Sequence, residues 1–193
     1  MPIIKILPNL ITIARIISVP FIISLLLDEE FVLAFWLFMV AGASDGVDGY
    51  LAKHFDARTR LGAYMDPLAD KVMLTALFVA LGVQGALPTW LVVLAVSRDL
   101  TIVGSVLLTN AMGYEIEIRP QYMSKINTLV QITLVVLVLA TLAFPIDDPR
   151  ILAYGVPAVA ATTILSWLGY LWSWVLILGG FEDSESEDKD EGS

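Results

Sequence analysis

Four aspartates between positions 45 and 70 have the side-chain type and the spacing that metal-dependent chemistry requires. Asp45 and Asp48 are three positions apart, and Asp66 and Asp70 are four apart. In a helix, each pair therefore lies on one face. Two adjacent antiparallel helices joined by a short loop can point these faces at each other. Because four carboxylates in one place repel each other, the pattern predicts a site that binds cations.

The other residue types available narrow the choice of metal and of reaction. The chain has no cysteine and one histidine, so carboxylate ligands favour Mg²⁺, Mn²⁺ or Ca²⁺ over zinc. We expect two ions, an arrangement that clamps the attacking and leaving oxygens of a displacement at phosphorus. Gly49, Ala52 and Gly62 share these helix faces and leave room for a nucleotide. The alternative is a set of interfacial carboxylates that simply pair with nearby cations. Those cations are Lys53, Arg58, Arg60 and Lys71.

The composition predicts that the helices carrying these residues lie in a membrane. Hydrophobic residues make up 58% of the 193 positions and charged residues only 16%, and the mean hydropathy is +0.80. A membrane-spanning helix needs about 20 mostly apolar residues. We therefore expect an all-α bundle of six transmembrane helices, with a cytoplasm-facing active site between the second and third. The expected spans are 8–27, 31–53, 62–83, 89–108, 124–144 and 151–178.

The distribution of basic residues predicts the orientation. With an even number of spans, both termini lie on the same side of the membrane. That side receives Lys5, Lys53, Arg58, Arg60, Arg119, Lys125 and Lys189, whereas the opposite loops contain only Arg150. Because cytoplasmic loops carry the excess of Lys and Arg, both termini should be cytoplasmic. The expected location is a bacterial inner membrane.

An acidic segment follows the last span. The formal net charge is −9, and residues 181–193 contain seven acidic residues and one lysine. Such a segment buries too little apolar area to offset its ordering entropy, so we expect a disordered, solvated tail. A docking tail for a basic partner is the alternative. The predicted organisation is one membrane domain over residues 1–180 and a tail over 181–193, with no nucleic-acid partner.

The aspartate segment resembles the signature of the CDP-alcohol phosphatidyltransferase family, DxxDGxxAR(x8)GxxxDxxxD. The matching residues are Asp45, Asp48, Gly49, Ala52, Gly62, Asp66 and Asp70. Lys53 stands where the family usually has Arg, which keeps the charge but loses the planar fork that binds phosphate bidentately. The resemblance implies six transmembrane helices and a homodimer, and it covers the chain up to the acidic tail.

The resemblance also implies a reaction and a role for each matching residue. A phosphatidyl group is transferred from CDP-diacylglycerol to an alcohol, and CMP is released. The four aspartates would bind the metals, and Asp70 would also act as the general base. Contacts to the CDP part of the donor are expected from Gly49, Ala52, Lys53, Gly62 and Asn9.

Three further segments bear on the identity of the alcohol. The opening LPNLITIARIISVPFI resembles family members that make phosphatidylglycerol phosphate or cardiolipin. Arg98 and Asp99 are charged residues within an apolar span, which by default indicates a functional site, although they could also neutralise each other or a neighbouring helix. Together with the segment 119–131, they resemble cardiolipin synthases of the CDP-alcohol type more than phosphatidylglycerol phosphate synthases, and this resemblance implies phosphatidylglycerol as the acceptor. Glycerol 3-phosphate is the alternative acceptor, and the expected acceptor contacts are Arg98, Arg119, Lys125 and Arg15.

Two other functional classes compete with a transferase. A metal or ion transporter could also contain buried carboxylates, but transporters place them near the midplane in paired halves, and the second half here has no matching cluster. A membrane scaffold would not need aligned carboxylate faces. The single histidine, His54, is expected at the surface, and it excludes cardiolipin synthases of the phospholipase D type, which need two histidine motifs.

Overall fold

The fold is helical throughout the part of the chain that the structure describes. The computed structural model describes the backbone of residues 2–54, 60–111 and 122–190, and the side-chain environments of residues 11–44, 69–105 and 122–172. Within these ranges there are six helices and no strand. They are α1 (Pro2–Leu27), α2 (Phe31–His54), α3 (Arg60–Val83), α4 (Thr89–Ala111), α5 (Tyr122–Ala143) and α6 (Arg150–Asp190).

The helix boundaries confirm the six predicted segments and differ mainly at the two ends of the chain. α1 begins at Pro2 rather than at position 8, and α6 continues to Asp190. The helix therefore enters the acidic segment 181–193, and adding a residue to an existing helix is far easier than nucleating a new one. The disordered, solvated tail stays a prediction.

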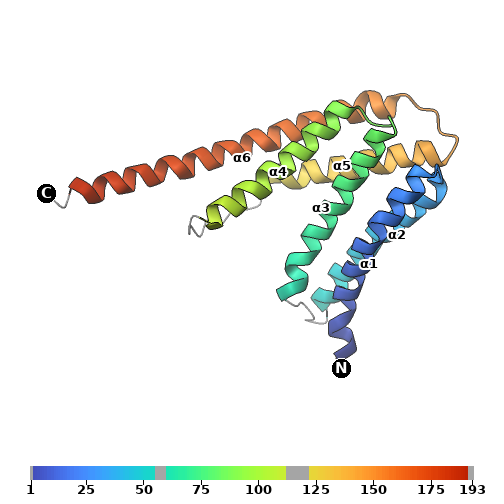
Figure 1. Ribbon diagram of the computed structural model, residues 1–193, viewed down its shortest axis with the longest axis horizontal. Helices are drawn as coiled ribbons and strands as arrows, with labels where there is room; N and C mark the ends of the chain where they lie inside the picture. The colour runs from blue at the N-terminus through green and yellow to red at the C-terminus, as the bar shows by residue number, and fades with distance from the viewer. Residues whose placement is uncertain (1, 55–59, 112–121, 191–193) are drawn as a thin grey trace.

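The helices form two arms that converge at one end of the molecule (Figure 1). α1 packs against both α2 and α3, while α5 packs against α6 and also against α2. α4 packs against α6 and α3, so α3 joins the two arms. The connections α1–α2, α3–α4 and α5–α6 lie at the end where the arms converge (Figure 1).

Two tight turns at this end follow the same hydrogen-bonding pattern. Glu30 N–H donates to Leu25 C=O at 2.8 Å, and Glu29 has φ 61°. Ala86 N–H likewise donates to Leu81 C=O at 2.9 Å, and Gly85 has φ +74°. Both are Schellman-type helix ends, in which a left-handed residue closes the last turn. Glycine adopts this conformation without the steric cost that Glu29 bears.

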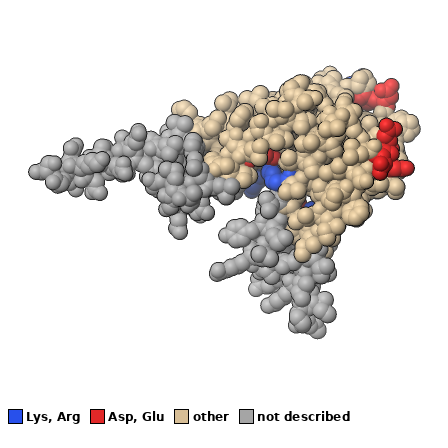
Figure 2. Space-filling view, in the orientation of Figure 1, with Lys and Arg blue, Asp and Glu red and all other residues tan. Residues whose placement is uncertain are grey.

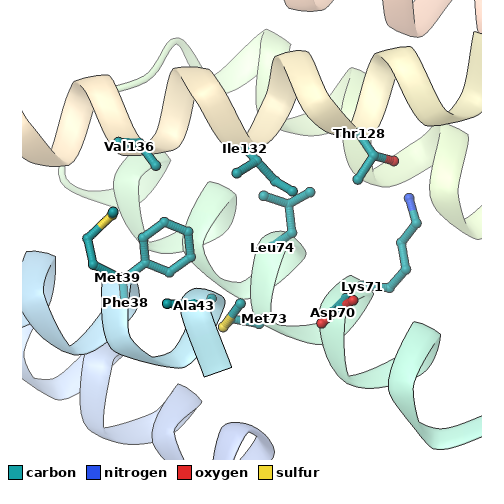
Figure 3. A pocket seen from close by; sticks show the side chains of 11 residues that line it. Phe38, Met39, Ala43, Asp70, Lys71, Met73, Leu74, Thr128, Ile132 and Val136 are labelled. Carbon is teal, nitrogen blue, oxygen red and sulfur yellow. The ribbon is translucent and has the colours of Figure 1, made fainter. Parts of the chain in front are cut away.

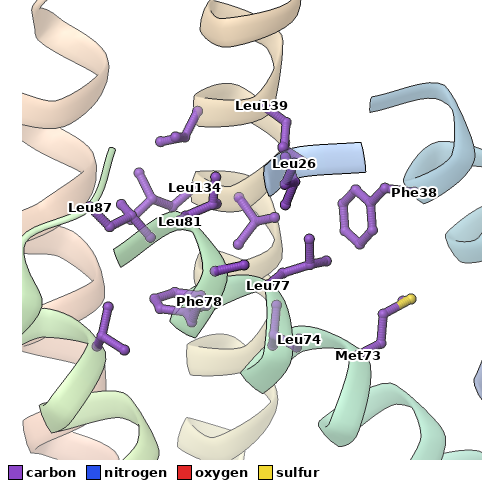
Figure 4. Close-up of a cluster of buried hydrophobic side chains, with 14 of the residues drawn as sticks. Leu26, Phe38, Met73, Leu74, Leu77, Phe78, Leu81, Leu87, Leu134 and Leu139 are labelled. Carbon is purple, nitrogen blue, oxygen red and sulfur yellow. The ribbon is translucent and has the colours of Figure 1, made fainter. Parts of the chain in front are cut away.

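The convergent end contains a continuous apolar core to which all six described helices contribute. Leu26 of α1, Phe38 of α2 and Leu81 of α3 are each at most 4% exposed. They belong to one cluster with Leu91 of α4 and Leu139 of α5 (Figure 4). This core fixes the helix ends relative to each other, and it leaves the divergent end to form the site.

The outer surface of the bundle is apolar to an extent that suits lipid contact. Large hydrophobic side chains are exposed on several helices, among them Phe21, Trp36, Leu100, Leu165 and Trp172. Among the described residues, α5 and the stretch Arg150–Trp172 of α6 are long and apolar enough to cross a membrane, and Ile11–Leu27 and Phe31–Ser44 are shorter apolar helices. An exposed apolar surface of this extent is typical of proteins that contact a membrane or another protein.

Candidate active site

Asp70 and Arg15 form an ion pair where α1, α2 and α3 meet. Arg15 Nη1 lies 2.7 Å from Asp70 Oδ1, and Arg15 Nε donates to the Ala41 carbonyl at 3.3 Å. The Arg15 side chain is 1% exposed, whereas the Asp70 side chain is 44% exposed. Arg15 therefore holds one oxygen of Asp70 from the protein interior while the carboxylate stays accessible. The predicted site residue Arg15 is thus brought to one of the predicted aspartates, from 55 positions away in sequence.

A second charged cluster lies one residue further along α3. Lys71 Nζ lies 3.0 Å from Asp99 Oδ1, and Arg98 Nη1 lies 2.7 Å from the same oxygen. Arg98 Nη2 donates to Ser124 Oγ at 2.8 Å and to Ser166 Oγ at 2.6 Å. The cluster therefore connects α3 to α4 through the Asp99 carboxylate, and α4 to α5 and α6 through the Arg98 guanidinium. Arg98 and Asp99 do neutralise each other in part, as their adjacency suggested.

A cavity of about 490 Å³ lies between α2, α3 and α5, with Asp70 and Lys71 in its wall. Its polar end is formed by these two residues and Thr128 (Figure 3). The rest of the wall is mostly apolar and includes Phe38, Met39, Met73, Leu74, Ile132 and Val136. Ligand pockets typically have volumes of about 300–1,000 Å³ and a mainly apolar lining with a few polar groups.

A seam of buried polar side chains continues along α5 and α6. Asn127 Oδ1 accepts hydrogen bonds from Thr163 Oγ1 at 2.9 Å and from Thr162 Oγ1 at 3.0 Å. Sequence reasoning missed this seam and the role of Ser166. A signal was present, because Ser124, Asn127 and Gln131 recur at i, i+3 and i+7 of an apolar helix. Such side chains commonly bond across helices in membrane proteins.

The remaining predicted site residues are placed by their helices alone or lie outside the described part. Backbone positions are described for Asn9 on α1, for Asp45, Asp48, Gly49, Ala52 and Lys53 on α2, and for Gly62 and Asp66 on α3. The structure does not describe the side-chain environments of these residues. For Arg119, neither the backbone nor the side chain belongs to the described part. Lys125 is exposed, with its Nζ 5.9 Å from the centre of the Tyr122 ring.

The predicted metal ligands, which are all aspartates, suit a hard divalent cation. Among the described side chains, no group of three acidic or histidine residues forms a metal site. The side chains of Asp45, Asp48 and Asp66 lie outside the described part. Asp70 is the described member, and its half-exposed carboxylate faces the cavity. Its helix also positions Asp66, and α2 positions Asp45 and Asp48. A set made only of carboxylates fits Mg²⁺ or Mn²⁺.

A helical bundle with an apolar cavity and acidic and basic groups at its polar end fits an enzyme that acts on amphiphilic substrates. Residues 5–179 match the family model for CDP-alcohol phosphatidyltransferase. The chain belongs to this family of membrane-embedded enzymes.

Relatives within the family differ in the reactions that they are named for. The chain is 31% identical to a Bacillus subtilis CDP-diacylglycerol–glycerol-3-phosphate 3-phosphatidyltransferase, over 87% of this chain and 95% of that protein. It is 31% identical to the rat cardiolipin synthase (CMP-forming), over 84% of this chain and 59% of that protein. A chloroplastic glycerol-3-phosphate 3-phosphatidyltransferase from rice is 32% identical, over 85% of this chain and 55% of that protein. The chain thus spans little more than half the length of the rat and rice relatives.

Proposed function

We propose that this protein transfers a phosphatidyl group from CDP-diacylglycerol to phosphatidylglycerol, forming cardiolipin and releasing CMP. The observation that carries the choice of acceptor is the apolar cavity beside Asp70, between α2, α3 and α5. A lipid acceptor has to bring its hydroxyl to the reacting phosphorus while its acyl chains stay in an apolar environment. A cavity with a polar end at Asp70 and an apolar end between helices meets both needs.

In the proposed reaction, Asp70 accepts the proton of the acceptor hydroxyl. The hydroxyl oxygen forms a bond to the phosphorus that carries diacylglycerol, and the bond from that phosphorus to the CMP oxygen breaks. Arg15 contacts Asp70 Oδ1 at 2.7 Å, so it orients the carboxylate before the proton arrives. Mg²⁺ or Mn²⁺, held by Asp45, Asp48, Asp66 and Asp70, would supply charge stabilisation for the phosphate oxygens.

The other predicted contacts are retained as part of this proposal. Gly49, Ala52, Lys53, Gly62 and Asn9 are proposed to contact the CDP moiety, and Arg119 and Lys125 the acceptor. Arg98 is proposed to act indirectly, because it is 1% exposed and bonded to Asp99, Ser124 and Ser166. It therefore supports the acceptor side of the site through Asp99 rather than by direct contact.

A competition experiment tests the acceptor. Purified protein is given CDP-diacylglycerol with phosphatidylglycerol and glycerol 3-phosphate at equal availability, and the lipid products are identified by mass spectrometry. We expect cardiolipin to be the main product. Product that is almost entirely phosphatidylglycerol phosphate would instead support the alternative acceptor, which the names of the Bacillus subtilis and rice relatives favour.

We also propose a bacterial inner-membrane location with both termini in the cytoplasm, and a homodimer as in the family. The convergent end carries exposed acidic residues in two loops, Asp28, Glu29, Glu30, Asp147 and Asp148, which form acidic patches in Figure 2. Its loops contain only one basic residue, Arg150, so this end suits the side opposite the cytoplasm.

Single-cysteine labelling tests this orientation, because the chain has no native cysteine. In intact cells, a membrane-impermeant maleimide should label Asp148→Cys and leave Arg58→Cys unlabelled until the membrane is opened. Glu30→Cys serves as a matched control and should behave like Asp148→Cys. Labelling of position 58 from outside, with position 148 protected, would reverse the orientation.

A further inference from the structure

The described charges around Asp70 leave one cation without a full counter-charge. Arg15 pairs with Asp70, whereas Arg98 and Lys71 share one oxygen of Asp99. These five groups therefore sum to one positive charge. Arg98 is 1% exposed, and a buried guanidinium needs its carboxylate more than an accessible ammonium does. The surplus charge thus belongs to Lys71, whose side chain is 35% exposed.

Lys71 presents this charge to the cavity. Figure 3 shows the Lys71 side chain leaving α3 next to Asp70 and extending toward α5, so that its ammonium group lies near Thr128, with the apolar wall on the other side of the view. An ammonium group has three N–H donors, and Asp99 Oδ1 accepts one of them at 3.0 Å. Asp99 in turn is fixed by Arg98, which is itself held by Ser124 and Ser166. The lysine is therefore held in place while it retains donors for a ligand.

The cavity and its charge together define the chemistry of the ligand. An apolar wall with a cation at one end favours an amphiphile that carries a negative group next to an acyl chain. A phosphodiester carries one negative charge and matches the single surplus charge of the cluster. A dianionic phosphate monoester would leave one charge uncompensated within these described residues.

We propose that Lys71 binds the phosphodiester of the acceptor lipid, with Asp99 as its positioning residue. This inference rests on the proposed function, since it names the group that holds the acceptor while its hydroxyl reaches Asp70. The donor is a less suitable source of this phosphate, because the proposed metal site already provides for its pyrophosphate. Lys71 thereby becomes a determinant of acceptor specificity, and it favours a lipid phosphodiester over a soluble phosphate monoester.

Direct binding tests the inference independently of turnover. The purified protein in detergent is titrated with short-chain phosphatidylglycerol and, separately, with short-chain CDP-diacylglycerol, and binding is followed by native mass spectrometry. Lys71→Gln should weaken binding of phosphatidylglycerol by at least about tenfold, because it removes a charge-assisted hydrogen bond. Binding of CDP-diacylglycerol should change less than about threefold. Lys71→Arg should recover most of the lost affinity for phosphatidylglycerol, since it restores the charge.

Two controls keep the outcomes distinct. Arg150→Gln removes one positive charge at the opposite end of the molecule and should leave both affinities unchanged, and circular dichroism checks that each variant is folded. Equal binding of phosphatidylglycerol by Lys71→Gln and the parent protein, or a loss confined to CDP-diacylglycerol, would overturn the inference. A parent protein that forms no cardiolipin yet shows the Lys71-dependent binding would contradict only the proposed acceptor reaction.

Discussion

Replacing Asp70 by Asn is expected to lower the turnover number by about a thousandfold or more. General-base catalysis alone typically contributes about a hundredfold to ten-thousandfold, and the proposed metal site would also lose one of its four carboxylates. The measurement is the rate of CMP release from CDP-diacylglycerol with phosphatidylglycerol as acceptor. Turnover within about threefold of the parent protein would reject Asp70 as both base and ligand.

The Asp70→Asn substitution is suited to this test because it should preserve the fold. The amide keeps an oxygen that can accept the hydrogen bond from Arg15 Nη1, and the side chain is 44% exposed. Arg15 also keeps its bond to the Ala41 carbonyl. Asp148→Asn is a matched control, because it removes a carboxylate from an exposed loop at the other end of the molecule. It should leave turnover unchanged.

The helices were predictable because strong breakers separate long apolar segments. Gly85 and Pro88 mark the connection between α3 and α4, and the predicted segment ended at position 83, as α3 does. The end of α6 was not predictable in this way. The acidic composition argued against order, but the preceding apolar turns continue as helix to Asp190. Local composition describes what a segment prefers alone and omits the helix already formed beside it.

The site was predictable in its residue types but not in its pairings. The aspartate spacing and the charges Arg98 and Asp99 were visible because both violate the apolar pattern of the sequence around them. The ion pair between Arg15 and Asp70 joins positions 55 apart, and Ser166 meets Arg98 across 68 positions. Hydropathy determines which segments are helices but does not determine which helices are neighbours. The packing of α5 against α2, which creates the cavity, therefore had to come from the structure.

Removal of divalent metal is expected to abolish turnover, by about a thousandfold or more. Without cations, the four aspartates would repel the donor's pyrophosphate, and Arg15 and Lys71 supply too little positive charge to offset them. A thousandfold loss corresponds to about 4 kcal/mol of transition-state stabilisation, which is within the several kcal/mol that a bound metal ion contributes. Turnover is measured after exhaustive treatment with EDTA and again after addition of Mg²⁺, Mn²⁺ or Zn²⁺.

The metals that restore turnover indicate whether the ligands are carboxylates. Mg²⁺ and Mn²⁺ should each restore most of the turnover, whereas Zn²⁺ should restore little, because the predicted ligands are all carboxylates. Binding of Mn²⁺, followed by electron paramagnetic resonance, should weaken by at least about tenfold in Asp70→Asn and remain unchanged in Asp148→Asn. Full turnover in EDTA would refute the metal site while leaving the family assignment intact. Loss of turnover in EDTA without a change of Mn²⁺ binding in Asp70→Asn would keep the metal and remove Asp70 from its ligands.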